Sequence, residues 1–376
     1  MSWYNEVVRK VNTPCYVYHE AGLRTSFSLA KAAANKHNID IHFAIKANHR
    51  DNVLKLIQAA GIGVECVSGG EIKQSLLSGF SPDKIGMAGS AKSDAEIKLA
   101  IASQIGSLHV ESLEELAVIE EIAAGLQQPI SVLLRLNPNI DAETHANIRT
   151  GTEEDKFGIP EMDWKACVAF FKTAKWTQFE GLHYHVGSQV LNMNVFKQLV
   201  KRSAQDCALF EGQGLIISTL NLGGGLGINY ANPKEHPPFE EYFNAIGEAR
   251  TFFTGKLIVE LGRSLVGQHA VLLTKVLFTK GSEQSPKVLV DAGMTDLARP
   301  ALYQAYHDIE NVLSDAPMQE QNVFGPICES SDCFAKKRVF PKAKRGDILA
   351  IHSVGAYGET MQSGYNLRDK CPVEWI

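Results

Sequence analysis

The sequence predicts an α/β protein, a (β/α)₈ barrel joined to a C-terminal β-rich domain that also takes the N-terminal strand. From about residue 40 to 261, short apolar runs alternate with segments of helical spacing. The runs are continuously apolar, as in parallel strands that are covered on both faces. Eight repeats in about 220 residues match the count and length of a closed barrel. An open doubly wound sheet is the alternative.

The barrel elements follow one another in a regular order. The expected strands are Ile41–Lys46, Gly63–Val67, Lys84–Ala88, Ser107–Val110, Ser131–Leu136, Glu180–Val186, Thr219–Leu222 and Lys256–Glu260. Helical spacing marks the segments between the first strands, which are Asn52–Ala60, Glu71–Leu77, Asp94–Ala102 and Leu113–Ala123.

The alternation of strands and helices ends after Arg263, where β-rich runs follow one another without regular helices between them. Strands are expected at His269–Thr279, Lys287–Asp291 and Asp347–His352, with one helix near Tyr303–Tyr306. The opening run Pro14–Tyr18 should pair with these C-terminal strands. We therefore expect a barrel over residues 20–265 and a β-domain made of residues 1–19 and 266–376.

The composition excludes several classes of function. The 376 residues are 45% hydrophobic and 21% charged, with a formal net charge of −5, so no basic field favours a nucleic-acid partner. No apolar run approaches the ~20 residues that span a bilayer, and the N-terminus lacks a signal-peptide pattern. Seven cysteines without a Cys-x-x-Cys pair favour free thiols in the cytoplasm, with no disulfide framework and no metal site.

Reactive side chains are expected at the ends of the strands, where barrels of this kind gather their functional groups. Lys46 ends the first strand, His183 and His185 the sixth, and Glu260 the eighth. Each alone could be structural, since a lysine at a strand end is usually solvated. Their joint placement favours a site. The acidic segment Thr144–Asp155, after the fifth strand, is expected to be a lid or specificity loop.

A phosphate site is expected in the loops after the seventh and eighth strands, which carry Gly223–Gly225 and Gly262. Consecutive glycines leave backbone N–H groups unshielded, so a phosphate can approach closely. A phosphate facing the amine of Lys46 suggests pyridoxal phosphate. Glu260 could then hold the pyridine nitrogen protonated, or simply form a salt bridge with Arg263, and His185 could stack on the ring.

Eight short motifs occur in order along nearly the whole chain, at Ala44–Asn48, Val67–Glu71, Lys156–Ile159, His183–Gln189, Asn221–Gly227, Arg299–Tyr303, Gly325–Asp332 and Gly355–Gly358. Together they resemble the motifs of the fold-type III, alanine-racemase-like pyridoxal phosphate decarboxylases. Within that family the sequence is most similar to the branch that converts meso-2,6-diaminopimelate to L-lysine.

The resemblance implies a role for each matching residue. Lys46 would bind the cofactor covalently, His185 would stack on it, and Cys328 would return the proton after CO₂ leaves. The remaining cofactor contacts would be Ser188, Gly224, Gly225, Glu260, Gly262, Arg263 and Tyr357. The substrate pocket would comprise Arg263, Arg299, Tyr303, Glu329 and Tyr357. The resemblance also implies a homodimer with shared active sites, because the Cys328 segment reaches the partner's site.

Chemistry supports two of these roles independently. A thiol has a pKa near 8.5, closer to the working pH than that of a lysine, which suits reprotonation. The planar forks of Arg263 and Arg299 suit the carboxylate at the far end of diaminopimelate, and Glu329 suits the amine. Two departures from the family pattern stand out: Leu261 in place of the usual proline, and Glu65 in place of a shorter aspartate.

Three alternatives remain open from the sequence. A related decarboxylase of ornithine, lysine, arginine or carboxynorspermidine would share the fold and cofactor but bind no far carboxylate. An alanine racemase would need acids on both faces of the ring, whereas the candidate here is a cysteine. A non-catalytic relative would be expected to lose the lysine, the cysteine or the glycine loop, and this chain keeps all three.

Overall fold

The computed structural model describes residues 3–140 and 156–376, so the expected loop Thr144–Asp155 lies outside the described residues. The chain divides into two compact units. The barrel unit comprises Phe27–Gly227 and Pro238–Gly262, and the β unit comprises Met1–Ser26, Ile228–Pro237 and Arg263–Ile376.

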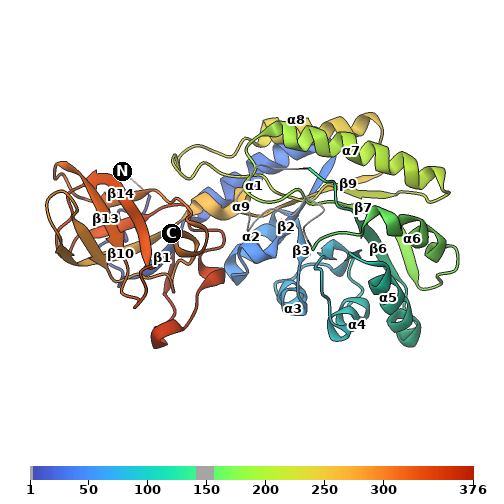
Figure 1. Cartoon of the computed structure of the whole chain (residues 1–376), viewed down its shortest axis with the longest axis horizontal. Helices are drawn as coiled ribbons and strands as arrows, with labels where there is room; N and C mark the ends of the chain where they lie inside the picture. Colours follow the sequence, from blue (N-terminus) through green and yellow to red (C-terminus); the bar gives the residue numbers. More distant parts are fainter. Residues whose placement is uncertain (1–2, 141–155) are drawn as a thin grey trace. The chain divides into compact units, whose positions relative to one another are not determined.

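The barrel unit contains eight parallel strands that close into a TIM barrel, as the sequence predicts, and the open sheet is excluded (Figure 1). Closure comes from the pairing of the first and last strands, which places His42 opposite Glu260. In chain order the strands are β2 Ile39–Ala44, β3 Gly63–Cys66, β4 Ile85–Met87, β5 Ser107–Val110, β6 Ile130–Arg135, β7 Thr177–His183, β8 Thr219–Asn221 and β9 Lys256–Leu261.

Three successive helices around the barrel begin with the same local signal, a serine followed three residues later by a glutamate. The side chains of Ser68, Ser93 and Ser112 each accept a hydrogen bond from the backbone N–H of that glutamate, which satisfies a donor at the helix start. The helices are α1 Glu20–Asn35, α2 Asp51–Ala59, α3 Gly69–Leu77, α4 Asp94–Ala102, α5 Leu113–Leu126, α6 Trp164–Phe171, α7 Met193–Gly212 and α8 Phe239–Gly247.

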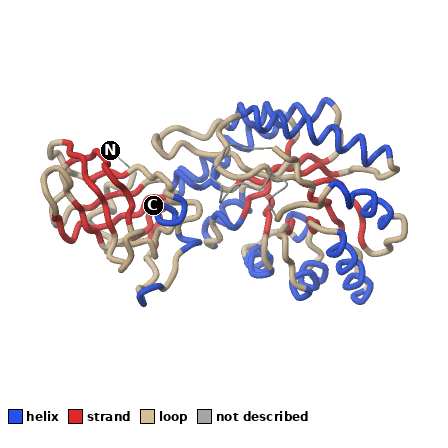
Figure 2. Tube along the Cα trace, viewed as in Figure 1, coloured by secondary structure: helices blue, strands red, loops and turns tan. Residues whose placement is uncertain are grey.

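The β unit is built on one eight-stranded sheet with few helices (Figure 2). Its central path runs β12-β15-β10-β11-β13-β14, with β1 joined to β10 and β16. The strands are β1 Cys15–Tyr18, β10 Ala270–Lys280, β11 Lys287–Val290, β12 Ile309–Val312, β13 Met318–Phe324, β14 Cys333–Pro341, β15 Ile348–Ile351 and β16 Val373–Trp375. The expected pairing of the N-terminal strand is confirmed, since β1 runs antiparallel to β10 and parallel to β16.

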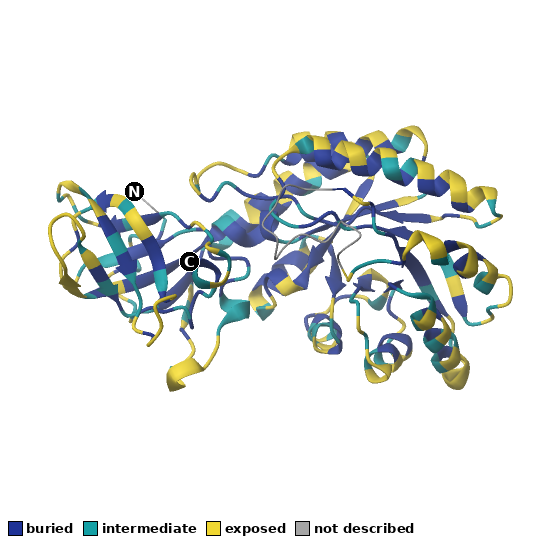
Figure 3. Ribbon diagram, in the orientation of Figure 1, coloured by how far each residue is buried: buried dark blue, intermediate teal, exposed yellow. Residues whose placement is uncertain are grey.

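Apolar side chains from both ends of the chain share one core in the β unit. Val17 of β1 and Leu273 of β10 are buried there with Tyr4 and Ala350. Burial of the barrel strands contrasts with the exposed outer faces of the helices around them (Figure 3). None of the described helices is long and apolar enough to cross a membrane.

One expected helix is misplaced. The sequence puts it near Tyr303–Tyr306, but helix α10 spans Arg299–Tyr303, and another short α-helix of the β unit is α9 Arg263–Val266. Pro300 stands in the first turn, where a missing N–H does no harm, and Gln304 ends the helix in the left-handed conformation with φ 52°.

Candidate active site

A cavity of about 370 Å³ opens at the carboxyl ends of the barrel strands, within the range of small-molecule sites. Lys46, His185 and Glu260 all line it. Lys46 lies in a short 3-10 turn that follows β2, and its side chain is exposed. His185 lies two residues beyond the end of β7. The barrel unit therefore brings together the three residues expected to contact the cofactor ring.

The glycine loop after β8 approaches its neighbours too closely for any side chain. A Cβ on Gly224 would lie 1.9 Å from the backbone oxygen of Glu260, and one on Gly223 would lie 2.1 Å from that of Tyr184. Gly223 and Gly225 also have positive φ angles of 67° and 116°, which favour glycine. The loop therefore packs its backbone directly against the strands that carry the site.

The backbone amide of Gly224 fixes the ring of His185. It donates to the Nδ1 atom at 3.3 Å, so Nδ1 is the accepting nitrogen and the proton resides on Nε2. Burial, and then the neighbouring Lys46, lower the pKa of His185 well below its ordinary value. A neutral imidazole in one tautomer is suited to stack on a flat ring.

Asn221, at the end of β8, connects the glycine loop to Glu260. Its side-chain NH₂ donates to Glu260 Oε1 at 2.8 Å, while its side-chain oxygen accepts from the Gly223 N–H at 2.9 Å. Glu260 is buried, and its hydrogen bond with Asn221 joins β9 to the end of β8. The sequence motif contains Asn221, but its role as a positioning residue was not predicted.

Four titratable side chains form a layer inside the barrel, here called the interior polar layer: Glu65, His109, His183 and Glu260. They come from β3, β5, β7 and β9, which are alternate strands, and alternate strands supply each side-chain layer of such a barrel. Bulky branched side chains usually fill these positions. A polar layer here is therefore a specialised feature of the site.

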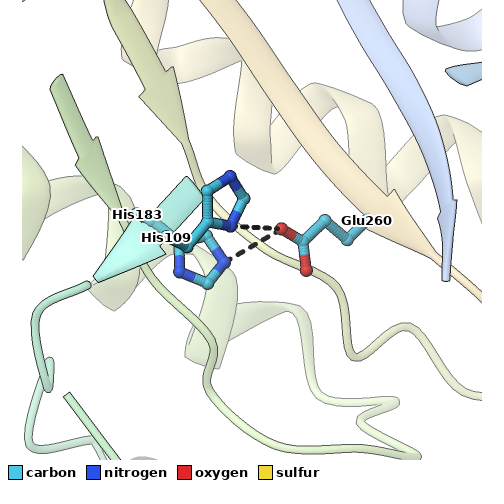
Figure 4. Close-up of side chains that lie close together, drawn as sticks. All are labelled: His109, His183 and Glu260. Atoms are coloured by element: carbon cyan, nitrogen blue, oxygen red, sulfur yellow. Dashed lines mark ion pairs between the residues drawn. The ribbon is translucent and has the colours of Figure 1, made fainter. Parts of the chain in front are cut away.

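The contacts within the layer converge on one carboxylate oxygen (Figure 4). Glu260 Oε1 lies 2.9 Å from His183 Nε2 and 3.8 Å from His109 Nδ1. Glu65 Oε1 lies 3.2 Å from His109 Nδ1 on the other side. The two imidazole rings pack against each other with their centroids 4.3 Å apart.

Burial controls the protonation of the layer. It lowers the pKa of both His109 and His183 well below the ordinary value, so both rings are neutral. Burial, and then the charge of Glu260, raise the pKa of Glu65 well above the ordinary value. Glu65 is accommodated because Gly86 has no side chain; a Cβ there would lie 2.3 Å from Glu65 Oε2.

A second buried pair borders the cavity. Arg135, the last residue of β6, forms an ion pair of 2.5 Å with Glu111, and its guanidinium carbon lies over the Phe157 ring, 4.6 Å from the ring centre. Glu111 also accepts from the Gly158 N–H at 3.1 Å. This pair explains the Lys156–Ile159 motif structurally, because the motif supplies both the ring and the amide. Arg135 and Glu111 were not predicted as site residues.

The β unit holds a second group of functional side chains, here called the arginine cluster: Tyr230, Arg263, Arg299, His307 and Tyr357. Arg263 donates to the Tyr230 hydroxyl, and its guanidinium carbon lies 4.8 Å from the centre of the Tyr357 ring. Arg299 lies over the other ring, 4.6 Å from the Tyr230 centre. The structure therefore brings three predicted substrate residues together and adds Tyr230 and His307, which sequence reasoning missed.

The remaining predicted residues lie elsewhere in their units. Cys328 and Glu329 belong to an exposed segment after β13, where the Cys328 N–H donates to Asn366 at 3.4 Å and Glu329 accepts from Ser331 at 2.9 Å. Tyr303 ends α10 and is half-buried. In the barrel unit, Ser188 is half-buried in the loop after β7, and Gly262 directly follows β9.

The barrel cavity fits pyridoxal phosphate. It provides an exposed amine at Lys46, a neutral ring at His185 and a buried carboxylate at Glu260. His109, His183 and Glu260 also present atoms within 4.8 Å of one another, a set that could hold a metal ion. The two imidazoles already face the carboxylate that suits the pyridine nitrogen. The expected lack of a metal site therefore stays a prediction.

Comparison with known proteins agrees with this cofactor. The sequence profile described as "Pyridoxal-dependent decarboxylase, pyridoxal binding domain" matches residues 21–267, which is most of the chain. The matched range contains the whole interior polar layer and every residue of the cavity. Fold and site together define a pyridoxal-dependent decarboxylase.

Full-length relatives narrow the family further. A diaminopimelate decarboxylase from Bacteroides thetaiotaomicron is 43% identical over 365 residues, covering 96% of this chain and 95% of the relative. The crystal structure of diaminopimelate decarboxylase from Helicobacter pylori complexed with L-lysine matches with a TM-score of 0.94 at 36% identity, covering 99% of this chain and 94% of that one. The chain belongs to the diaminopimelate decarboxylase family of pyridoxal-dependent enzymes.

More distant matches show that the fold is shared, and no more. A lysine/ornithine decarboxylase from Vibrio vulnificus complexed with putrescine superimposes with a TM-score of 0.84 at 21% identity, covering 99% of this chain and 96% of that one. At that identity the match carries no information on substrate.

Proposed function

We propose that the protein decarboxylates meso-2,6-diaminopimelate to L-lysine with pyridoxal phosphate as cofactor. The proposal rests on two sets of functional groups. An amine, an imidazole and a carboxylate lie around the barrel cavity, and the arginine cluster contains two buried guanidiniums. The first set suits the cofactor, and the second suits a substrate that has a carboxylate at its far end.

In the barrel unit, each residue has a distinct task. Lys46 holds the cofactor covalently through its amine, and His185 packs on the face of the ring. Ser188, Gly224, Gly225 and Gly262 hold the phosphate. Glu260, kept in place by Asn221 and His183, keeps a proton on the pyridine nitrogen. When bound, the cofactor supplies the electron sink that stabilises the negative charge left on Cα after CO₂ departs.

In the β unit, we assign substrate recognition and proton return. Arg263 and Arg299 bind the far carboxylate with Tyr303 and Tyr357 beside them, and Glu329 binds the far amine. Arg263 and Tyr357 also contact the cofactor. Cys328 donates the proton that replaces CO₂ on Cα. Support for this last role comes from its exposure, which leaves the thiol accessible to another molecule.

A substrate panel tests the reaction. Release of CO₂ should be fastest with meso-diaminopimelate among that compound, L-ornithine, L-lysine, L-arginine and carboxynorspermidine. The related decarboxylases are the second candidate because they share the fold and cofactor. A higher kcat/KM with any substrate that lacks the far carboxylate would replace our assignment. A protein that takes up no pyridoxal phosphate and releases no CO₂ would instead be a non-catalytic relative.

We further propose a homodimer in which the Cys328 segment of one chain completes the site of the other. The segment is exposed in the β unit, as an interface segment of a single chain would be. Mixing the inactive variants Lys46→Ala and Cys328→Ala tests this. About one quarter of wild-type activity should return, because half of the dimers are mixed and each has one intact site. No recovery after subunit exchange would place both residues of a site in one chain.

The cellular location is proposed from the cysteines. All seven are free thiols in the structure, five of them buried. Free thiols in this number are typical of a reducing compartment, so we propose the cytoplasm.

A further inference from the structure

Arg299 is a buried cation that lacks a carboxylate partner. It is 6% exposed, and among the described residues no aspartate or glutamate is one of its main electrostatic neighbours. The charged and polar groups around it include Tyr230, Arg263, Tyr357, Tyr303 and His307, and burial lowers the pKa of Arg299 to about 10. A buried charge without a counter-ion is costly, so an anionic ligand group is the natural partner of this guanidinium.

His307 fixes the orientation of that guanidinium. Arg299 Nη1 lies 2.8 Å from His307 Nε2, and His307 Nδ1 lies 2.7 Å from the backbone oxygen of His352. A carbonyl oxygen can only accept, so Nδ1–H donates to His352 and the lone pair of Nε2 accepts from Arg299. Burial, and then the charge of Arg299, lower the pKa of His307 well below its ordinary value. The ring is therefore a neutral acceptor in a single tautomer.

Tyr230 holds the same guanidinium from another direction. Its ring lies 4.6 Å from the Arg299 guanidinium carbon and meets the His307 ring edge-on, with centroids 5.0 Å apart at 74°. Its hydroxyl accepts from Arg263. The plane of Arg299 is thus held by a ring face and by one hydrogen bond. One N–H donor is used by His307, and the others of the five remain for a ligand.

We propose that His307 is a positioning residue that gives the protein its specificity for a substrate with a far carboxylate. It accepts one N–H of Arg299 and so holds the planar fork ready for bidentate binding of that carboxylate. The inference rests on the proposed function, because the carboxylate belongs to the proposed substrate. Beyond that function, a neutral histidine that the sequence analysis did not predict sets the orientation of the arginine that binds the far carboxylate.

Two probes separate positioning from simple packing. L-lysine keeps the amino and carboxylate groups of the far end of diaminopimelate, whereas cadaverine has the same carbon chain without any carboxylate. Binding of each is measured by titration calorimetry on the holoenzyme, after the cofactor content has been checked by absorbance. Loss of a contact that serves only the carboxylate should change the affinity for L-lysine and leave the affinity for cadaverine unchanged.

The variants are His307→Leu, which removes the acceptor, and His307→Gln, whose side-chain oxygen can replace it. We expect His307→Leu to weaken L-lysine binding by about 10- to 100-fold, the size of one hydrogen bond to a charged group. Cadaverine binding should stay within a few-fold. KM for diaminopimelate should rise in parallel, with a small change in kcat. His307→Gln should recover most of the loss and remains informative if the leucine variant fails to fold.

His269→Gln is the matched control, because His269 is another buried histidine of the β unit and lies outside the arginine cluster. Both affinities should stay at wild-type values in it. Equal losses for L-lysine and cadaverine in His307→Leu, or no loss for either, would overturn the positioning role. If wild type neither binds L-lysine nor turns over diaminopimelate, the proposed function fails instead, so the two failures are distinguishable.

Discussion

The interior polar layer and the arginine cluster are both buried groups of polar side chains, but the side chains that can carry charge differ in sign. The layer contains two acidic side chains, Glu65 and Glu260, and the cluster contains two guanidiniums, Arg263 and Arg299. A buried charge calls for an opposite partner. The layer is therefore suited to a protonated ring nitrogen, and the cluster to a carboxylate.

Neutral histidines serve both regions in different ways. In the layer, His183 and His109 face the carboxylate of Glu260. In the cluster, His307 accepts a hydrogen bond from a cation. Burial lowers the pKa of all three, so each ring stays neutral. In both regions, neutral histidines hold their partner side chains in place without adding a charge of their own.

The largest effect is expected outside both regions, at Cys328. Cys328→Ala should lower kcat by about 10²–10⁴-fold, the usual contribution of a positioned acid. Cofactor content and L-lysine affinity should be unchanged, because the layer and the cluster are intact. Steady-state kinetics and calorimetry measure this, with Cys333→Ala as the control on a nearby half-buried thiol. Full activity in Cys328→Ala would rule out the thiol as proton donor.

The next effect tests the charge of the layer. Glu260→Gln keeps the size of the side chain but removes the negative charge opposite the ring nitrogen. We expect kcat to fall by about 10²–10³-fold, as when one electrostatic contact to a developing charge is lost. The visible spectrum of the bound cofactor should change as well. A variant with wild-type kcat and an unaltered spectrum would show that the carboxylate does not control the ring.

A smaller effect tests the cluster. Arg299→Lys keeps the positive charge but replaces a planar fork by a point charge, so KM for diaminopimelate should rise by about 10- to 100-fold with little change in kcat. Arg345→Lys, at an exposed position of the same unit, is the control. Unchanged KM in Arg299→Lys would place Arg299 outside the substrate pocket.

The smallest effect concerns Glu65 and pH. Its pKa is raised in the folded state, so between about pH 4.5 and that raised value the folded protein binds a proton that the unfolded chain does not. The free energy of unfolding must therefore fall as pH rises through this window. Glu65→Gln removes this loss, so the variant should gain stability relative to wild type as pH rises, by about 1–2 °C in Tm for each kcal/mol in a chain of this length.

Thermal unfolding at pH 5 and pH 8 measures this difference. His42 and His109 lie 3.9 and 3.2 Å from Glu65, and both remain in the variant. The charged groups that act on Glu65, which are Glu260, Lys46, Lys92 and Glu71, also remain. Glu241→Gln, at an exposed position of the barrel unit, should show no such pH trend. A Tm difference that is the same at both pH values would mean that Glu65 is ionised in the folded protein.

The barrel could be predicted because apolar runs indicate buried strands. Eight such strands that alternate with helices are compatible with only a few fold topologies. The same signal misplaced strand ends. The sixth strand was expected to reach Val186, but β7 ends at His183, because Tyr184 and Val186 are buried without joining the strand. In the β unit, β13 and β14 escaped prediction because both carry mixed polar and apolar side chains and are partly exposed.

Site residues that belong to recognisable sequence motifs could be predicted. Site residues that stand alone in the sequence could not. Lys46, His185 and Glu260 meet in one cavity as expected. His109 and His307 escaped because a lone histidine in an apolar run is more often an ordinary core residue. Their contacts depend on which strands alternate inside the barrel and on how the chain returns to His352, and these are properties of the fold.

The central claim is that the barrel cavity holds pyridoxal phosphate on the amine of Lys46. Borohydride treatment of the holoenzyme makes the bond between lysine and cofactor permanent, and peptide mapping by mass spectrometry then locates it. The account predicts a single modified peptide that contains Lys46, and none in Lys46→Ala. Modification of Lys92, the other lysine that lines the cavity, or no modified lysine at all, would contradict it.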